Sequence, residues 1–260
     1  MDPVSLKCFG VGDGWPCDDR NHSSFLFRFG QTSILVDAGE SLSSSYKASG
    51  LSYDYFDRML ISHFHGDHIG GFFMFMQSLW LEQRQKNLPI HMPGYGIEPV
   101  RKMLDTAMIF DELLSCSTDF IPLMARQPVM EHKVKITPFH TTHLESLREA
   151  WQPKYKHPFE AFSFLFETPT HRIAHSADIG APQDLDPLLE RPVDMLVCEL
   201  SHFRRKDLFD YLRGRPIGKI VFIHVARKYW KNLPETTALA ESMLGGIPFQ
   251  FARDGEEILL

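Results

Sequence analysis

Cysteine is scarce in this chain, and it lacks the spacing that disulfide-rich proteins need. The 260 residues include only Cys8, Cys17, Cys116 and Cys198, with no Cys-x-x-Cys pair among them. Small secreted scaffolds depend on a dense and regular set of cysteines. The sequence therefore excludes a disulfide framework, and we expect reduced thiols in a cytoplasmic protein.

Long apolar runs and long basic runs are also missing. The most apolar stretch, Ile69 to Leu81, has about 13 residues, whereas a bilayer span needs ~20. The first ten residues lack the basic and apolar regions of a signal peptide. The net charge is −6, and the cluster Arg204 to Lys206 is short enough to be a solvated helix face. We therefore expect no membrane association, do not favour a nucleic-acid partner, and expect a small-molecule substrate.

The pattern of short apolar runs predicts a mixed α/β (α+β) protein. Ser24 to Val36 reads as a hairpin turning at Gly30-Gln31, and the segment from Ile69 to Gln83 as a buried helix. Further helices are expected at Pro99–Leu114 and Pro182–Glu190, and a closing hairpin over Asp254-Gly255. The chain shows no repeat, linker or low-complexity tract. We therefore expect one domain over residues 1–260, with two sheets sandwiched between helices.

One short segment contains most of the candidate metal-binding residues. In the run HFHGDHIGG, His63, His65, Asp67 and His68 follow a predicted strand and precede a helix. Histidine makes up 13 of 260 residues, so this HxHxDH pattern arises by chance in about one chain in a thousand. A single tetrahedral zinc ion does not require all of its ligands to come from one strand-to-helix turn. Two metal ions would use the four residues in pairs, so the motif favours a dinuclear site.

Two metal ions need more ligands, and three later residues qualify. His143, Asp178 and His224 each follow a predicted apolar strand. Chemistry is often placed on the loops at strand ends. His140 stands three residues before His143, so the sequence leaves two candidates there, of which we favour His143.

The series HxHxDH, His, Asp, His resembles the metallo-β-lactamase superfamily over nearly the whole chain. The resemblance implies a four-layer αββα sandwich. It also implies that Asp37, in ILVDAGE, orients the site without binding metal. The implied ligands are His63, His65 and His143 for one ion and Asp67, His68 and His224 for the other, with Asp178 bridging both.

Within that superfamily, the sequence is similar to ribonuclease Z and its phosphodiesterase relatives. The similarity lies in RNHSSFLFRFGQTSILVDAGE, HSADIG and CELSHF. Asp178 stands where β-lactamases carry cysteine, which argues against β-lactam hydrolysis. The basic, glycine-rich arm of ribonuclease Z has no counterpart between His143 and Asp178, and its His-Ser-Thr motif is missing after Glu199. His202 is the candidate to replace that motif's histidine, and cleavage of precursor tRNA is disfavoured.

The expected cofactors are two divalent metal ions, with Zn²⁺ as first choice and Mn²⁺ or Fe as alternatives. Such ions generate a hydroxide nucleophile at neutral pH, which Asp67 is expected to orient while it also binds metal. His202 or His175 is expected to protonate the leaving group, and the sequence does not choose between them. Trp15, in a glycine-rich loop near the N-terminus, is expected either to line a pocket or to anchor its loop.

We therefore predict a metal-dependent hydrolase, in the first place a phosphodiesterase acting on a small or cyclic phosphodiester. The alternative is a hydrolase of carboxyl esters, lactones or thioesters like glyoxalase II or the lactonases. A ribonuclease Z-type endonuclease is the least favoured of the three. The oligomeric state stays open, with a homodimer as one option.

Overall fold

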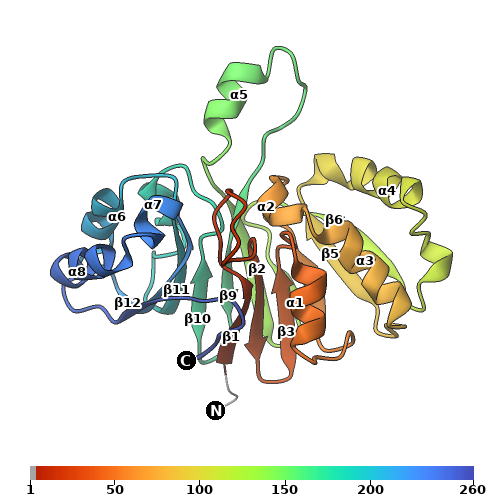
Figure 1. Cartoon of the computed structure of the whole chain (residues 1–260), viewed down its shortest axis with the longest axis horizontal. Helices are drawn as coiled ribbons and strands as arrows, with labels where there is room; N and C mark the ends of the chain where they lie inside the picture. Colours follow the sequence, from red (N-terminus) through yellow and green to blue (C-terminus); the bar gives the residue numbers. More distant parts are fainter. Residues whose placement is uncertain (1–3) are drawn as a thin grey trace. The chain divides into compact units, whose positions relative to one another are not determined.

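The protein, described here by a computed structural model covering residues 4–260, divides into two compact units. The first contains the chain up to Met124 together with Arg253–Leu260, and the second contains Ala125–Ala252. Each unit is built on one seven-stranded mixed sheet (Figure 1). A mixed α/β class is what the sequence predicts.

The sheet of the first unit has the strand order β14-β1-β2-β3-β4-β5-β6. Its strands from β3 to β6 are parallel, and the others pair antiparallel. Because β3 and β4 are parallel neighbours, the residues that follow them emerge at the same sheet edge. The strands are β1 (Val4–Gly10), β2 (Ser24–Phe29), β3 (Thr32–Val36), β4 (Arg58–Leu60), β5 (Leu88–Met92), β6 (Thr118–Pro122) and β14 (Glu257–Leu259).

Helices of the first unit pack on this sheet and share a core with it. The core joins Tyr46 of α1 and Phe75 of α3 to sheet residues such as Leu35 and Met59. Figure 1 shows α1 and α3 beside each other along the strands. The helices are α1 (Leu42–Ala48), α2 (Gly66–Ile69), α3 (Phe72–Leu81) and α4 (Ile97–Thr106), with short 3₁₀ turns at η1 (Gly94–Gly96) and η2 (Asp111–Leu113).

The sheet of the second unit has the order β13-β12-β11-β10-β9-β8-β7. The strands from β10 to β13 are parallel, so the carboxyl ends of β10, β11 and β12 meet at one edge. The strands are β7 (Val129–Glu131), β8 (Val134–His140), β9 (Phe162–Glu167), β10 (Arg172–His175), β11 (Val193–Leu200), β12 (Ile217–Val225) and β13 (Phe249–Phe251).

Two helices of the second unit bury no residue, the longer one being α5 (Glu145–Trp151) and the shorter one α7 (Arg227–Trp230). The helix α5 lies beyond the ends of β8 and β9 (Figure 1). No pattern in the sequence predicts α5, because the helix has no buried apolar face to produce a helical periodicity. The remaining elements are η3 (Pro182–Leu185), α6 (Arg205–Leu212) and α8 (Leu233–Met243).

Three of the predicted elements differ from the structure. The helix expected over Ile69–Gln83 is interrupted at Gly70-Gly71, where a Cβ on Gly71 would lie 2.2 Å from the Gly39 carbonyl oxygen. The helix expected over Pro99–Leu114 ends at Thr106, and Met108 has a φ of 59°. The helix expected over Pro182–Glu190 is only a 3₁₀ turn over Pro182–Leu185.

The predicted closing hairpin is wrong. Phe249–Phe251 pairs with β12 in one sheet, whereas Glu257–Leu259 pairs with β1 in the other. The turn between them contacts the loop after β1 instead, because the Asp254 carboxylate accepts the backbone N–H groups of Val11 and Asn21.

Throughout residues 4–260, every helix falls short of the length and apolarity that a bilayer crossing requires.

The Arg84 side chain joins two segments of the first unit, residues 53–56 and residues 84–87. Its side chain is 1% exposed, lies over the Phe56 ring at 4.4 Å, and donates to the carbonyl oxygens of Tyr53, Phe56, Lys86 and Asn87. Removing one side chain would leave several buried carbonyl groups without a donor.

We expect Arg84→Met to lower the free energy of unfolding by about 3 kcal/mol, because buried acceptors lose a charged donor. Urea denaturation of the purified protein measures this loss. Arg101→Met is the matched control, since the Arg101 side chain is 49% exposed in the same unit. Equal losses in the two variants would contradict this account of Arg84.

Candidate metal centre

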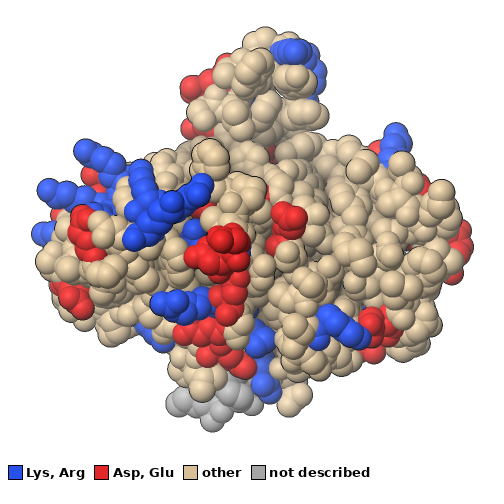
Figure 2. Space-filling view, in the orientation of Figure 1, with Lys and Arg blue, Asp and Glu red and all other residues tan. Residues whose placement is uncertain are grey.

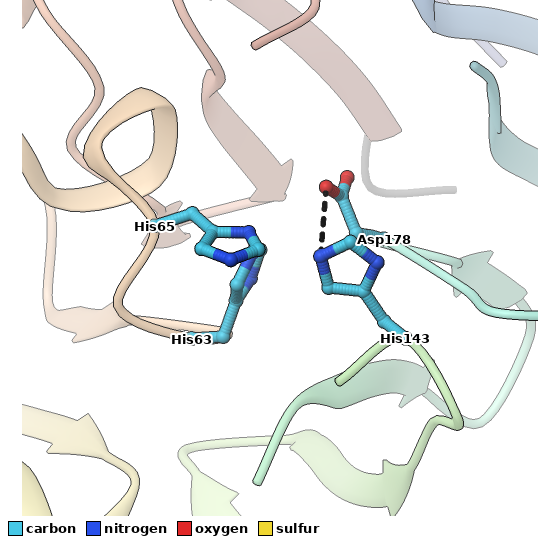
Figure 3. A group of neighbouring side chains, drawn as sticks. All are labelled: His63, His65, His143 and Asp178. Carbon is cyan, nitrogen blue, oxygen red and sulfur yellow. Dashed lines mark hydrogen bonds and ion pairs between the residues drawn. The ribbon is translucent and has the colours of Figure 1, made fainter. Parts of the chain in front are cut away.

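In the first unit, the four residues of the HxHxDH motif lie where the chain leaves β4 and enters α2. The Nε2 atom of His63 lies 3.1 Å from Nδ1 of His65, and Figure 3 shows the two rings edge to face. The rings of His63 and His68 are 4.1 Å apart. The Nε2 atom of His68 lies 3.5 Å from an oxygen of Asp67. Imidazole nitrogens and a carboxylate thus converge at one corner.

Asp37 holds this corner in place from the end of the neighbouring strand. It is fully buried, and its carboxylate accepts both the backbone N–H and the hydroxyl of Ser62, at 2.7 and 2.9 Å. The same carboxylate lies 2.8 Å from Nδ1 of His68. Because Nδ1 is engaged in this way, the Nε2 atom of His68 is the nitrogen directed toward Asp67. Histidines that bind metal are commonly held by a carboxylate in this manner.

In the second unit, three histidines surround the buried carboxylate of Asp178. Its Oδ2 atom lies 3.6 Å from Nε2 of His143, the ion pair that Figure 3 marks, and 3.7 Å from Nε2 of His202. Its Oδ1 atom lies 3.6 Å from Nε2 of His224. Asp178 therefore directs one oxygen toward His143 and the other toward His224, the arrangement expected of a carboxylate shared by two metal ions.

The backbone around these residues is strained. Asp37, Ala177 and His224 all have positive φ angles, of 60°, 45° and 46°. Such conformations cost non-glycine residues about 1–3 kcal/mol each and gather at functional sites. Nearby hydrogen bonds support the strained turn, since Thr141 donates its hydroxyl to the Asp178 carbonyl oxygen at 2.8 Å. Sequence patterns contain no signal for this strain.

The two histidines that compete with predicted site residues have different surroundings from them. His140 is the last residue of β8, and its ring lies 4.6 Å from that of Phe162. His143, by contrast, faces Asp178. His175 is fully buried within β10, whereas the His202 side chain is 31% exposed.

His202 has a carboxylate partner, Glu199, that the sequence pattern alone does not assign. Its Nδ1 atom lies 2.8 Å from Oε1 of the fully buried Glu199. Glu199 also accepts the backbone N–H groups of Ile179 and Ser201. The His202 ring lies 4.4 Å from that of His143 and stacks on that of His224 at 5.5 Å. The spacing Glu-x-x-His was the signal available in the sequence.

The donor set fits divalent metals of the zinc type. Imidazole nitrogens and carboxylate oxygens suit Zn²⁺, Fe and Mn²⁺. All four cysteines are free thiols, and none belongs to a group of side chains in residues 4–260 that could hold a metal ion. Burial raises the pKa values of Cys8 and Cys198, so these thiols stay protonated at neutral pH. The donors available in these groups are therefore imidazole nitrogens and carboxylate oxygens.

Comparison with solved structures identifies the fold. The metallo-β-lactamase fold protein YhfI from Bacillus subtilis matches with a TM-score of 0.80 and 19% identity, over 100% of both chains. Yeast PDE1 matches with a TM-score of 0.73 and 14% identity, also over 100% of both chains. The predicted fold class is confirmed.

Comparison with known sequences then identifies the family. A ribonuclease Z from Thermococcus kodakarensis is 35% identical over 103 residues, which are 39% of this chain and 33% of that protein. The chain spans 33% to 51% of the length of two such ribonuclease Z sequences. The fold is therefore that of the metallo-β-lactamase fold proteins, and part of the sequence is similar to ribonuclease Z. More specifically, residues 4–206 match the model of the Anti-Pycsar protein Apyc1 family, and the chain belongs to that family.

We expect Asp37→Asn to weaken zinc binding by about 10- to 100-fold, because His68 loses the carboxylate that orients it. Competition with a chromogenic zinc chelator measures the affinity, and circular dichroism checks the fold. Asp105→Asn, at an exposed position on α4, is the control. Wild-type zinc affinity in Asp37→Asn would show that Asp37 does not support the metal centre.

Proposed function

We propose that this protein is a metal-dependent phosphodiesterase that hydrolyses a small or cyclic phosphodiester. The observation that carries the proposal is the environment of Asp178. One of its oxygens faces His143 and the other faces His224, while His202 lies beside the first. A shared carboxylate next to a partly exposed histidine suits a dinuclear hydrolase that also needs a proton donor.

The proposed ligands divide into two groups that share Asp178. The first group is His63, His65 and His143, and the second is Asp67, His68 and His224. Zn²⁺ is the first choice, with Mn²⁺ or Fe as alternatives, because all three accept imidazole and carboxylate ligands. When bound, two such ions would activate water at neutral pH and neutralise negative charge on the phosphoryl oxygens.

The protein's own groups would perform the proton transfers. Asp67, at the start of α2, would orient the attacking water through its carboxylate. His202 would donate the proton on Nε2 to the leaving oxygen, while Glu199 holds Nδ1 and so fixes the ring. His175 is fully buried in β10 and is not suited to this role.

Positive charge close to His224 in the chain favours a phosphodiester over a neutral ester or lactone. Arg227 and Lys228 begin α7, three and four residues after His224, and both are exposed. Figure 2 shows Lys and Arg side chains gathered over this part of the second unit. Guanidinium and ammonium groups recognise phosphate oxygens, whereas a lactone carries no charge to match them.

We expect the zinc-loaded protein to hydrolyse bis(p-nitrophenyl) phosphate, and His65→Ala and Asp178→Ala to lose more than about a hundredfold in activity. Removing a ligand should cost more than the 10- to 100-fold typical of residues that merely support ligands. Absorbance of released p-nitrophenol measures turnover, and Asp210→Asn, an exposed residue of α6, is the control. Full activity in either ligand variant would refute the site, and turnover of lactones alone would favour the ester hydrolase.

We expect His202→Ala to reduce kcat by about 10²- to 10⁴-fold for a substrate with an alkoxide leaving group, because that group must be protonated. The loss should be much smaller with a p-nitrophenol leaving group, which departs without a proton. Glu199→Gln should show the same pattern in weaker form, and His140→Ala is the control. Metal content is measured in each variant, and equal losses with both leaving groups would contradict proton donation by His202.

A further inference from the structure

We propose that Trp15 contacts the substrate and stacks on a planar aromatic group carried by the phosphodiester. This inference rests on the proposed function, since it names a feature of the substrate of that same site. It begins from the loop between β1 and β2, which lies entirely within the first unit.

Hydrogen bonds pin the base of this loop on both sides. The Asp254 carboxylate accepts the backbone N–H groups of Val11 and Asn21, at 3.0 and 2.5 Å. The backbone N–H of Gly12 donates to the Asn21 carbonyl oxygen at 2.7 Å, and the Asn21 side chain donates to the carbonyl oxygen of Phe9. A Cβ on Gly10 would lie 1.8 Å from the His22 carbonyl oxygen, so only glycine fits there. The loop therefore has a fixed base.

The middle of the loop lies against a proposed metal ligand. A Cβ added to Gly14 would lie 3.4 Å from an Asp67 carboxylate oxygen, which is van der Waals contact. Adjacent Cα atoms are 3.8 Å apart, so the Cα of Trp15 lies within about 9 Å of that oxygen. A substrate whose phosphate sits near Asp67 would bring its remaining groups within reach of the indole.

Trp15 is not packed as a loop anchor. It is 65% exposed, whereas the aromatic residues that stabilise this unit, such as Phe56 and Phe75, are fully buried. The fixed loop base lowers the conformational cost of binding, because only the two side-chain torsions of the indole remain to be ordered by a stacked ligand. Of the two roles that the sequence left open, the structure supports lining the substrate site.

The chemistry of an indole determines what it recognises. Its large π-face favours offset stacking on another flat ring, whereas a small alkyl group has no ring with which the indole can stack. Stacking with a distal group acts on ground state and transition state alike, so it changes KM more than kcat. Trp15 should therefore make the enzyme prefer aryl over alkyl phosphodiesters.

The test compares two substrates that release the same p-nitrophenol. Bis(p-nitrophenyl) phosphate retains an aromatic ring after cleavage, whereas methyl p-nitrophenyl phosphate retains only a methyl group. We expect Trp15→Ala to raise KM for the first substrate about tenfold and to leave KM for the second nearly unchanged. Trp15→Phe keeps a flat ring and should restore most of the preference.

A matched control and a binding measurement complete the test. Leu81→Ala removes another exposed apolar side chain, 57% exposed at the end of α3, and should change neither KM. Calorimetric titration of the zinc-loaded protein with p-nitrophenyl phosphate should show about tenfold weaker binding in Trp15→Ala.

The outcomes separate the two proposals. Normal turnover in Trp15→Ala with an unchanged ratio of the two KM values would overturn the role of Trp15 and leave the phosphodiesterase intact. Absence of phosphodiester turnover in the wild type, with binding that still depends on Trp15, would overturn the function instead. Equal binding of p-nitrophenyl phosphate by wild type and Trp15→Ala would also overturn the role of Trp15.

Discussion

A buried carboxylate needs positive charge or hydrogen-bond donors close to it, and Asp178 meets this constraint with imidazoles. It is 2% exposed, and its oxygens lie 3.6–3.7 Å from the Nε2 atoms of three histidines. A charge removed from water in this way is unfavourable unless it is paired or binds a metal ion. Neutral imidazole is a good metal ligand and a weak partner for a bare carboxylate. The most direct explanation of the cluster is a cation that Asp178 and the histidines share.

The rest of each unit can be understood as support for such a cluster. Parallel strands bring the ends of β10, β11 and β12 to one edge, where Asp178, Glu199 and His224 are found. Parallel pairing of β3 with β4 does the same for Asp37 and the HxHxDH motif. Two carboxylates then hold two histidines by Nδ1, since Asp37 contacts His68 and Glu199 contacts His202. The Nε2 atom of each histidine is left directed toward a second carboxylate, Asp67 for His68 and Asp178 for His202. Positive φ angles at Asp37 and His224 are the backbone cost of this arrangement.

Local patterns in the sequence predicted the features that depend on residues close together in the chain. The HxHxDH motif is visible because its members lie within six residues, and the hairpin predicted over Ser24 to Val36 is formed by β2 and β3. The distant residues His143, Asp178 and His224 were candidates because each follows a predicted strand. The resemblance to a known superfamily supplied their division into two ligand sets and the role of Asp37.

The remaining features depend on tertiary structure and could not be predicted in this way. The closing hairpin was wrong because a turn pattern does not reveal that its two strands join different sheets. Helix α5 was missed because it has no buried face, and the pairing of Glu199 with His202 depends on how the chain turns after β11. The proposal for Trp15 rests on its exposure and on the position of Gly14 beside Asp67, and no sequence pattern shows either.

The central claim is that the two ligand sets form one dinuclear centre bridged by Asp178. A crystal structure of the zinc-loaded protein, with anomalous scattering recorded on both sides of the zinc absorption edge, tests it most directly. The account predicts two zinc peaks about 3.5–4 Å apart with the Asp178 carboxylate between them. A single peak, or zinc bound away from Asp178, would contradict it.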